Sequence, residues 1–267
     1  MFVYNIMNFL DKIWTDIPQG LNRANLYPYE APPVSFVINH GKLQKLPHKF
    51  KFDKRIPILA IGSNRSPSQL LRKFGKSEII PVTNITVKNF DVIYASLISY
   101  YGAVPATLWP VEGSEVRLSI IWLDNSQLKI MHETEAVGKA YDFVEFDNKI
   151  INFKSPFLIK GNIYGYVSKF GALNFGSKVF EVRALSAIKA KKRLLKSINQ
   201  QKALKFLSSK IINRCSKKYV LDFRNKVISD KDYRFKTIKK LNGIGIQPII
   251  TPWKIIKNIK TNSIKFY

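Results

Sequence analysis

Two stretches of the sequence place polar side chains where they could do chemistry, and the first is the turn Gly62-Ser63-Asn64. It interrupts the apolar run Ile58–Ile61 just before a helix-like pattern starts at Ser66. Glycine lets a backbone approach a ligand closely, and the unpaired N–H groups at a helix start favour anions. The turn therefore predicts a binding site for a carboxylate or phosphate, although the same residues also fit an ordinary strand–turn–helix connection.

The helix after this turn has a recognisable start. Ser66 fits the N-cap, Pro67 fits the first helical position, and Gln69 completes an S-x-x-Q capping box. We therefore expect the N-terminus of this helix to lie against the turn.

The second stretch is a helix that ends in an acid. Leu128, Met131 and Glu135 recur at helical spacing and share one face, while Glu133 points roughly opposite, rotated by about 200°. A carboxyl group beside Leu and Met is costly to bury unless it is paired, and such a group suits general acid–base catalysis. The alternative is that the helix simply ends at Glu135, with the carboxylate in solvent.

Other catalytic chemistries have little support. The three histidines, His40, His48 and His132, lack the spacing of metal ligands, and Cys215 is the only cysteine. The sequence contains neither a P-loop nor a G-x-S-x-G motif. We therefore predict no metal site and no internal disulfide.

In their order along the chain, these features resemble the γ-glutamylcyclotransferase-like family. The loop Ile61-Gly62-Ser63-Asn64 is followed by "PATLWPVEGSEVRLSIIWL", by a helix ending at Glu135-Ala136, and by Tyr141 at the start of a strand. The match covers about residues 57–146. Ile61 stands where the family usually has Tyr, His132 where it has Asp, and Ala136 where it has Gly.

The resemblance implies a fold, an activity and a site. The fold would be α+β, a small mixed β-barrel with flanking helices, and the activity would be that of a cyclising transferase or lyase that needs no cofactor. It would convert a γ-glutamyl amide into 5-oxoproline and a free amine, with Glu135 as the catalytic acid and base. The remaining implied site residues bind the substrate: Ile61, Gly62, Ser63, Asn64 and Tyr141.

The net charge of +26 suggests a second kind of function. Residues 181–267 hold 23 Lys and Arg against 4 Asp and Glu, so most of the excess lies there. Such a surface is typical of binding to nucleic acid or another anionic partner. An inactive scaffold that binds nucleic acid through residues 186–267 is therefore the alternative, with interleaved aromatic residues as stacking groups: Tyr219, Phe223, Tyr233, Phe235 and Trp253. A basic composition without function also explains the charge.

The pattern of elements predicts three parts: an N-terminal extension over 1–54, a core domain over 55–185, and a basic, largely helical extension over 186–267. No transmembrane segment or signal peptide is expected, so the cytoplasm is the predicted location. The predicted elements are a strand at 57–61, a helix at 67–73, strands within 79–97 and 104–123 with a turn at Glu112-Gly113, a helix at 126–135, a hairpin closed at Asp147-Asn148, a strand within 161–170, and a long helix from Ser186 to about Cys215.

Overall fold

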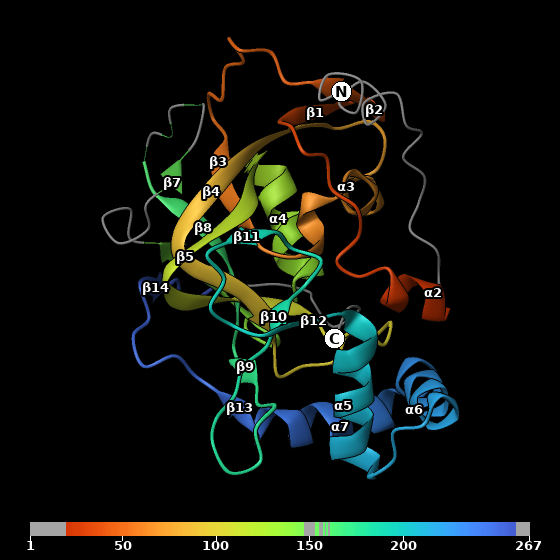
Figure 1. Cartoon of the computed structure of the whole chain (residues 1–267). Coiled ribbons are helices and arrows are strands. Elements are labelled where there is room, and N and C mark those ends of the chain that lie inside the picture. The colour runs from red at the N-terminus through yellow and green to blue at the C-terminus, as the bar shows by residue number, and fades with distance from the viewer. Residues whose placement is uncertain (1–19, 147–152, 155–156, 158, 160, 260–267) are drawn as a thin grey trace, which may run out of the picture.

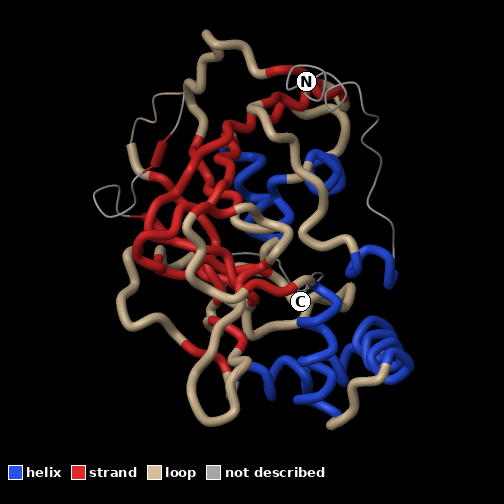
Figure 2. The backbone as a smooth tube through the Cα atoms, in the orientation of Figure 1, coloured by secondary structure: helices blue, strands red, loops and turns tan. Residues whose placement is uncertain are grey.

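The structure is a computed structural model that describes residues 20–146, 153–154, 157, 159 and 161–259. A large curved sheet lies beside two groups of helices (Figures 1 and 2). The α+β fold class predicted from the sequence is therefore confirmed.

The large sheet contains strands from most of the described chain. Across the sheet they lie in the order β12 (Ser197–Ile198), β10 (Ala184–Leu185), β4 (Ile79–Tyr94), β5 (Ala106–Leu123), β3 (Ile56–Ala60), β8 (Ile163–Ser168), β6 (Tyr141–Phe146) and β14 (Trp253–Ile255). The β3/β8 and β10/β12 pairs are parallel, and the other neighbours are antiparallel. In the part of the chain that the structure describes, this curved path of strands runs from β12 to β14, and no pairing is assigned between these two end strands.

The two central strands are longer than the sequence suggested. β4 and β5 pair along nearly their whole lengths, with a shift in register between Lys88 and Phe90. Gly113 has a φ of 77° and lies within this irregularity, so the predicted turn at Glu112-Gly113 is a local bend inside β5. β3, at Ile56–Ala60, agrees with the predicted strand to within one residue.

The extension before residue 55 also enters the sheet. β1 (Phe36–Asn39) pairs with β4 and with β2 (Lys42–Lys45), whereas α2 (Gly20–Asn25) lies beside the C-terminal helices (Figure 1). The first strand and the first described helix therefore join opposite parts of the molecule.

Two helices carry the motifs of the sequence analysis. α3 (Pro67–Phe74) and α4 (Asn125–Thr134) lie next to each other, and their apolar side chains share one core with β3 and β4. Asp124 caps α4 and exchanges hydrogen bonds with Gln127 in a capping box. None of the described helices is both long enough and apolar enough to cross a membrane.

The predicted helix from Ser186 to Cys215 is wrong over its first half. Residues 190–191 form β11, which pairs with β5, and β12 pairs with β10, so α5 (Gln200–Ile212) begins only after Asn199. Two further helices follow, α6 (Lys217–Ser229) and α7 (Lys231–Asn242), within the extension over 186–267 that the sequence predicts to be largely helical. Backbone pairing with the core strands overrides the helical pattern before α5.

The remaining strands are short. β9 (Ala172–Leu173) pairs with β13 (Gly245–Ile246) in a separate two-stranded sheet. β7 (Phe153–Lys154) pairs with β4, so this described part of the predicted hairpin does not pair with β6. The turn proposed at Asp147-Asn148 lies outside the described residues.

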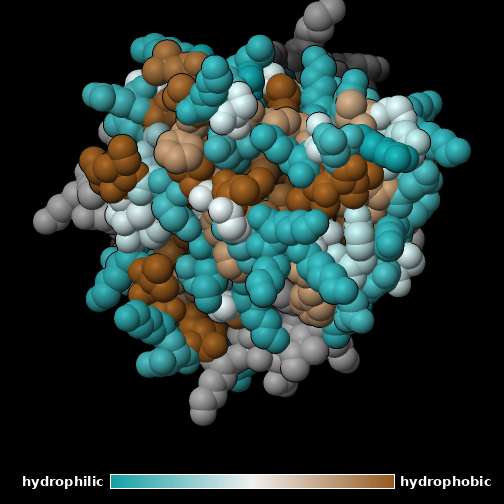
Figure 3. Space-filling model, turned by 90° about the horizontal axis from the view of Figure 1, so that it is seen from below, coloured by the Kyte–Doolittle hydropathy of each residue, from teal (hydrophilic) through white to brown (hydrophobic). Residues whose placement is uncertain are grey.

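The basic C-terminal helices pack on the core. Phe223 is 2% exposed within the main apolar cluster, and Trp253 packs edge-on against Phe146. Figure 3 shows the lower face of the molecule, where hydrophilic side chains surround separate hydrophobic patches. Because Phe223 cannot reach a base, the row of stacking aromatics proposed from the sequence gains no support.

A buried ion pair ties the C-terminal region to the sheet. The carboxylate of Asp91 on β4 is fully buried and accepts hydrogen bonds from Arg193 Nε at 2.7 Å and from Nη2 at 2.9 Å. Arg193 Nη2 also donates to the carbonyl oxygen of Ile188. This forked geometry holds the segment between β10 and α5 against the sheet.

We predict that Asp91→Ala lowers the free energy of unfolding by about 3 kcal/mol, because it leaves the guanidinium of Arg193 without its carboxylate. The matched control is Glu181→Ala, which breaks the more exposed pair with Arg183 and should cost less than about 1 kcal/mol. Urea unfolding of the three proteins measures both values. Equal losses in the two variants would contradict the structural role of Asp91.

Candidate active site

The turn after β3 forms a short helix of its own. Ser63–Arg65 make one 3-10 turn, η1, between β3 and α3. Its first N–H groups, those of Ser63 and Asn64, have no partner within the helix. The structure therefore has unpaired N–H groups directly after the buried strand β3, where the sequence predicts them.

The predicted capping box is wrong in its side chains. Ser66 is the N-cap of α3, but its hydroxyl makes no capping hydrogen bond, and its N–H donates to the carbonyl oxygen of Ser63. The side-chain oxygen of Gln69 accepts from Arg72 Nε at 3.1 Å. The preceding 3-10 turn sets the entry of the chain into α3, so Ser66 is not needed to cap it.

Gly62 lies where a side chain would not fit. A Cβ atom at this position would be 2.5 Å from the hydroxyl oxygen of Tyr27 and 3.2 Å from the Cβ of Ala106. Tyr27 Oη accepts from the N–H of Ala106 at 2.8 Å, and Tyr141 Oη donates to the carbonyl oxygen of Ala106 at 3.1 Å. The glycine is therefore required by close packing against a residue of the N-terminal extension.

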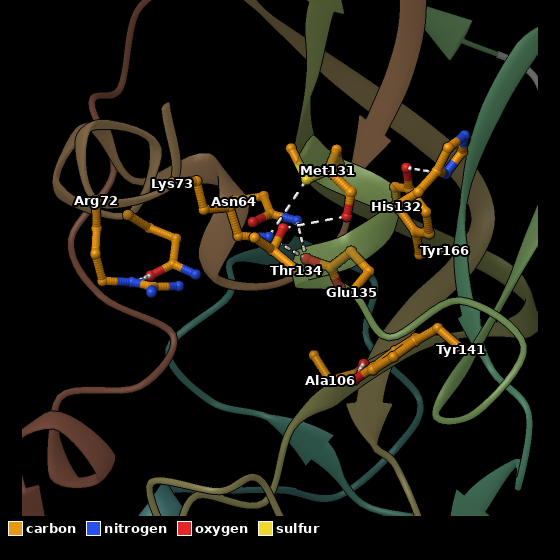
Figure 4. A network of polar contacts seen from close by, with 11 residues as sticks. Asn64, Arg72, Lys73, Ala106, Met131, His132, Thr134, Glu135, Tyr141 and Tyr166 are labelled. Carbon is orange, nitrogen blue, oxygen red and sulfur yellow. Dashed lines mark hydrogen bonds and ion pairs between the residues drawn. The ribbon is translucent and has the colours of Figure 1, made fainter. Parts of the chain in front are cut away.

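The two tyrosines that hold Ala106 stay protonated. Burial raises the pKa of Tyr27 and of Tyr141 well above the ordinary value of a phenol. Tyr141, predicted to bind substrate, thus uses its hydroxyl on the protein backbone while its ring lines the cavity described below. Figure 4 shows Tyr141 and Ala106 below Glu135.

Glu135 ends α4 and turns its side chain toward the turn after β3. Its Oε1 accepts from Asn64 Nδ2 at 2.9 Å, across 71 residues of sequence, and forms an ion pair with Lys73 Nζ. The Glu135 side chain is 16% exposed. The alternative that this carboxylate points into open solvent is therefore wrong, and the side chain of Asn64 binds the acid directly (Figure 4).

Lys73 is the partner that sequence reasoning missed. Its side chain is 1% exposed, and Nζ lies 3.3 Å from Met131 Sδ as well as against Glu135. Burial lowers the pKa of Lys73, opposed by Glu135, and the charges of Arg72 and Arg23 lower it further. The available signal was its place on α3, three residues after the buried Leu70 and thus on the apolar face.

The predicted site residues line one cavity. It is lined by residues from six separated parts of the chain, including three arginines, and Glu135 supplies the only carboxylate among its described lining residues. The predicted site residues on its wall are Ile61, Gly62, Ser63, Asn64, Glu135 and Tyr141, and the cationic ones are Arg23, Arg72, Lys73 and Arg234.

His132 lies behind the site. Its Nδ1 is 3.0 Å from Tyr166 Oη, and its ring packs edge-on against Phe143. Burial lowers the pKa of His132 to about 4, so the ring is neutral near pH 7. Figure 4 shows this contact apart from Asn64, although Tyr166 also lines the cavity. Within the described ranges, no cluster of three His, Cys, Asp or Glu side chains could hold a metal ion.

Comparisons with known proteins give the following matches. No family model matches the sequence, and no curated protein sequence matches it. A solved structure named gamma-glutamyl cyclotransferase is similar over 76% of this chain and 94% of its own, at 11% identity and a TM-score of 0.36. An ensemble-refined crystal structure of an uncharacterized human protein is similar over 77% of this chain and 95% of its own, at 12% identity and a TM-score of 0.36.

We predict that Gly62→Ala destabilises the protein by about 1–3 kcal/mol, because the new methyl group overlaps the hydroxyl of Tyr27. The double variant with Tyr27→Phe should lose less than the sum of the two single variants. Gly243→Ala is the control, since its Cβ would meet nothing closer than 3.5 Å. Thermal unfolding measures the four variants. Strict additivity would show that the hydroxyl is not what excludes a side chain at Gly62.

We predict that His132 makes stability depend on pH. The pKa of His132 is about 4 in the folded state and 6.5 ordinarily, so between these two pH values the unfolded chain binds more protons than the folded chain. This contribution is fully present above about pH 6.5 and is lost as the pH falls through about 4, on the order of 1–3 kcal/mol.

Urea unfolding of wild type, His132→Gln and the exposed-residue control His48→Gln across this pH range tests the prediction. The curve of His132→Gln should be flatter than the other two. Parallel curves for all three proteins would show that His132 does not change its protonation on unfolding.

Proposed function

We propose that this chain is a γ-glutamylcyclotransferase-like enzyme, which releases an amine from a γ-glutamyl amide and forms 5-oxoproline. The observation that carries the proposal is that the carboxylate of Glu135 and the turn Gly62-Ser63-Asn64 line one cavity. An acid on a helix end and an anion-binding turn are the two parts that this reaction needs.

The turn binds the α-carboxylate of the substrate. The N–H groups of Gly62, Ser63 and Asn64 donate to it, and the positive charge of Arg72, which lines the same cavity, favours an anion there. Ile61, which is buried and lines the cavity, presents apolar surface to the methylene groups of the glutamyl chain. The ring of Tyr141 supports the substrate from another side.

Glu135 moves the proton. The α-amine of the substrate attacks its own γ-carbonyl carbon, so a ring C–N bond forms and the amide C–N bond to the leaving amine breaks. Glu135 accepts a proton from the attacking amine and returns it to the leaving nitrogen, so no proton is gained or lost overall. A cavity that holds the substrate folded supplies much of the acceleration, because ring closure is a problem of proximity.

Lys73 and Asn64 hold the carboxylate for this task. Both contact Oε1, which fixes the rotamer of Glu135 and assigns the proton transfer to Oε2. A buried ion pair of this kind is costly unless its hydrogen bonds are well formed, and the amide of Asn64 adds one. The pair therefore positions the acid at the expense of stability.

We predict that Glu135→Gln lowers turnover by about 10²- to 10⁴-fold on any γ-glutamyl amide that the wild type cleaves, because the amide cannot accept the proton. Release of 5-oxoproline from a panel of γ-glutamyl amines, followed by chromatography, measures turnover. Glutamine preserves the shape of the side chain and an oxygen that can accept from Lys73.

The matched control is Glu133→Gln on the same helix, which lies outside the cavity lining and should keep wild-type turnover. Thermal unfolding of both variants separates a catalytic loss from unfolding. Equal activity of wild type and Glu135→Gln on every substrate, or no 5-oxoproline from the wild type on the whole panel, would overturn the proposal.

A further inference from the structure

The cavity of Glu135 is lined by more positive charge than its carboxylate can balance. Glu135 is already paired with Lys73, and Arg23, Arg72 and Arg234 line the same cavity. None of these three arginines forms an ion pair with a described acidic side chain. Asp230, at the start of α7, is a described acid whose charge acts on Arg234, but the two form no ion pair. The excess cationic charge is therefore not balanced by a paired carboxylate among the described residues.

Arg23 is built into the wall and has an unused donor. It is 3% exposed, and its guanidinium lies 3.9 Å from the ring centroid of Tyr101 and 4.9 Å from that of Tyr100. Its Nε donates to Tyr29 Oη at 3.4 Å, while Nη2 is buried without a hydrogen-bond partner. Stacking fixes the plane of the guanidinium and leaves one edge free for a ligand.

Arg234 contributes a second such group from α7. It is 9% exposed, and its Nη1 donates to the carbonyl oxygens of Val227 at 2.7 Å and Ile228 at 3.3 Å. Its Nε is buried and lacks a hydrogen-bond partner. Ile238, one helical turn later on α7, lines the same cavity.

Both arginines belong to the extensions on either side of the motif-bearing core. Arg23 lies on α2, and a third arginine, Arg224 of α6, holds this helix in place. Arg224 Nη1 donates to Asn25 Oδ1 at 2.9 Å, and Nη2 donates to the carbonyl oxygen of Leu21 at 2.7 Å. The N-terminal helix is thus fastened to the C-terminal helices, which sets Arg23 and Arg234 on one cavity.

We infer that Arg23 and Arg234 form a second anion-binding subsite, which takes a doubly charged oxyanion of the phosphate class. Two buried guanidinium groups without a paired carboxylate are costly, and one phosphate group offers two charges and several acceptors to offset both. A single carboxylate would leave one of the two cations uncompensated.

This inference deepens the proposed function and rests on it for the identity of the substrate. The turn at Gly62–Asn64 takes the glutamyl half, so the second subsite receives the amine half. The substrate is therefore a γ-glutamyl amide whose leaving amine carries a phosphate group. The core motifs define the reaction, and the two extensions define which amine is accepted.

Binding is tested first without chemistry, by titration calorimetry of the full chain with three glutaryl amides. Their amine halves are phosphoethanolamine, β-alanine and propylamine, and the missing α-amine prevents cyclisation. At about pH 8 the phosphate carries close to two charges. We expect the phosphate compound to bind about 10- to 100-fold more tightly than the propyl compound, with the carboxylate compound between them.

Variants then assign the difference to the two arginines. Arg23→Gln and Arg234→Gln should each reduce the phosphate preference about tenfold and leave the affinity for the propyl compound unchanged. Arg23→Lys and Arg234→Lys keep the positive charge but lose the paired N–H donors of the guanidinium. These variants should retain part of the preference for the phosphate compound. Arg214→Gln, on an exposed arginine between α5 and α6, is the control and should change nothing.

The matching γ-glutamyl amides give a readout in 5-oxoproline release. A preference for the phosphate compound in kcat/KM that falls in the two arginine variants supports the inference. Equal binding of the three glutaryl amides, a carboxylate compound that binds as well as the phosphate one, or an unchanged preference in both variants would overturn it. Arginine-dependent phosphate binding without 5-oxoproline release would instead overturn the proposed reaction and leave the subsite standing.

Discussion

The contact of Glu135 with Lys73 and Asn64 is the interaction on which the rest of the site depends. A carboxylate and an ammonium group placed this deep in a protein are unfavourable unless each satisfies the other. Their pairing requires the end of α4 to lie against α3 and the turn before it. The same packing places the turn beside the acid. The ion pair and this part of the cavity wall therefore form together.

The cavity is closed by parts of the chain that lie outside the motif. Tyr27 from the N-terminal extension lies against Gly62, and its hydroxyl accepts a hydrogen bond from the N–H of Ala106. The hydroxyl of Tyr141 donates to the carbonyl oxygen of the same residue. Arg224 fastens α2 to the C-terminal helices. The extensions therefore form walls of the cavity, and part of the chain's positive charge lines it.

Local patterns predicted the elements that carry the motif. β3, α3 and α4 have clear start and stop residues, and the structure has each within one or two residues of its predicted bounds. The helix expected from Ser186 failed because β11 and β12 pair with strands far away in sequence. The capping box at Ser66 failed because a 3-10 turn sets the entry into α3. In both cases, the backbone made hydrogen bonds with another segment in place of the hydrogen bonds that the local pattern predicted.

The sequence by itself determined the turn at Gly62–Asn64, the acid on the apolar face of α4, and the α+β class, because these follow from residue type and spacing. Only the tertiary structure decided that Lys73 pairs with Glu135 and that Arg23 and Arg234 line the cavity. Nothing in local periodicity specifies contacts between residues so far apart along the chain. Such contacts are chosen by the packing of whole elements, where the cost of an unpaired buried charge selects the partner.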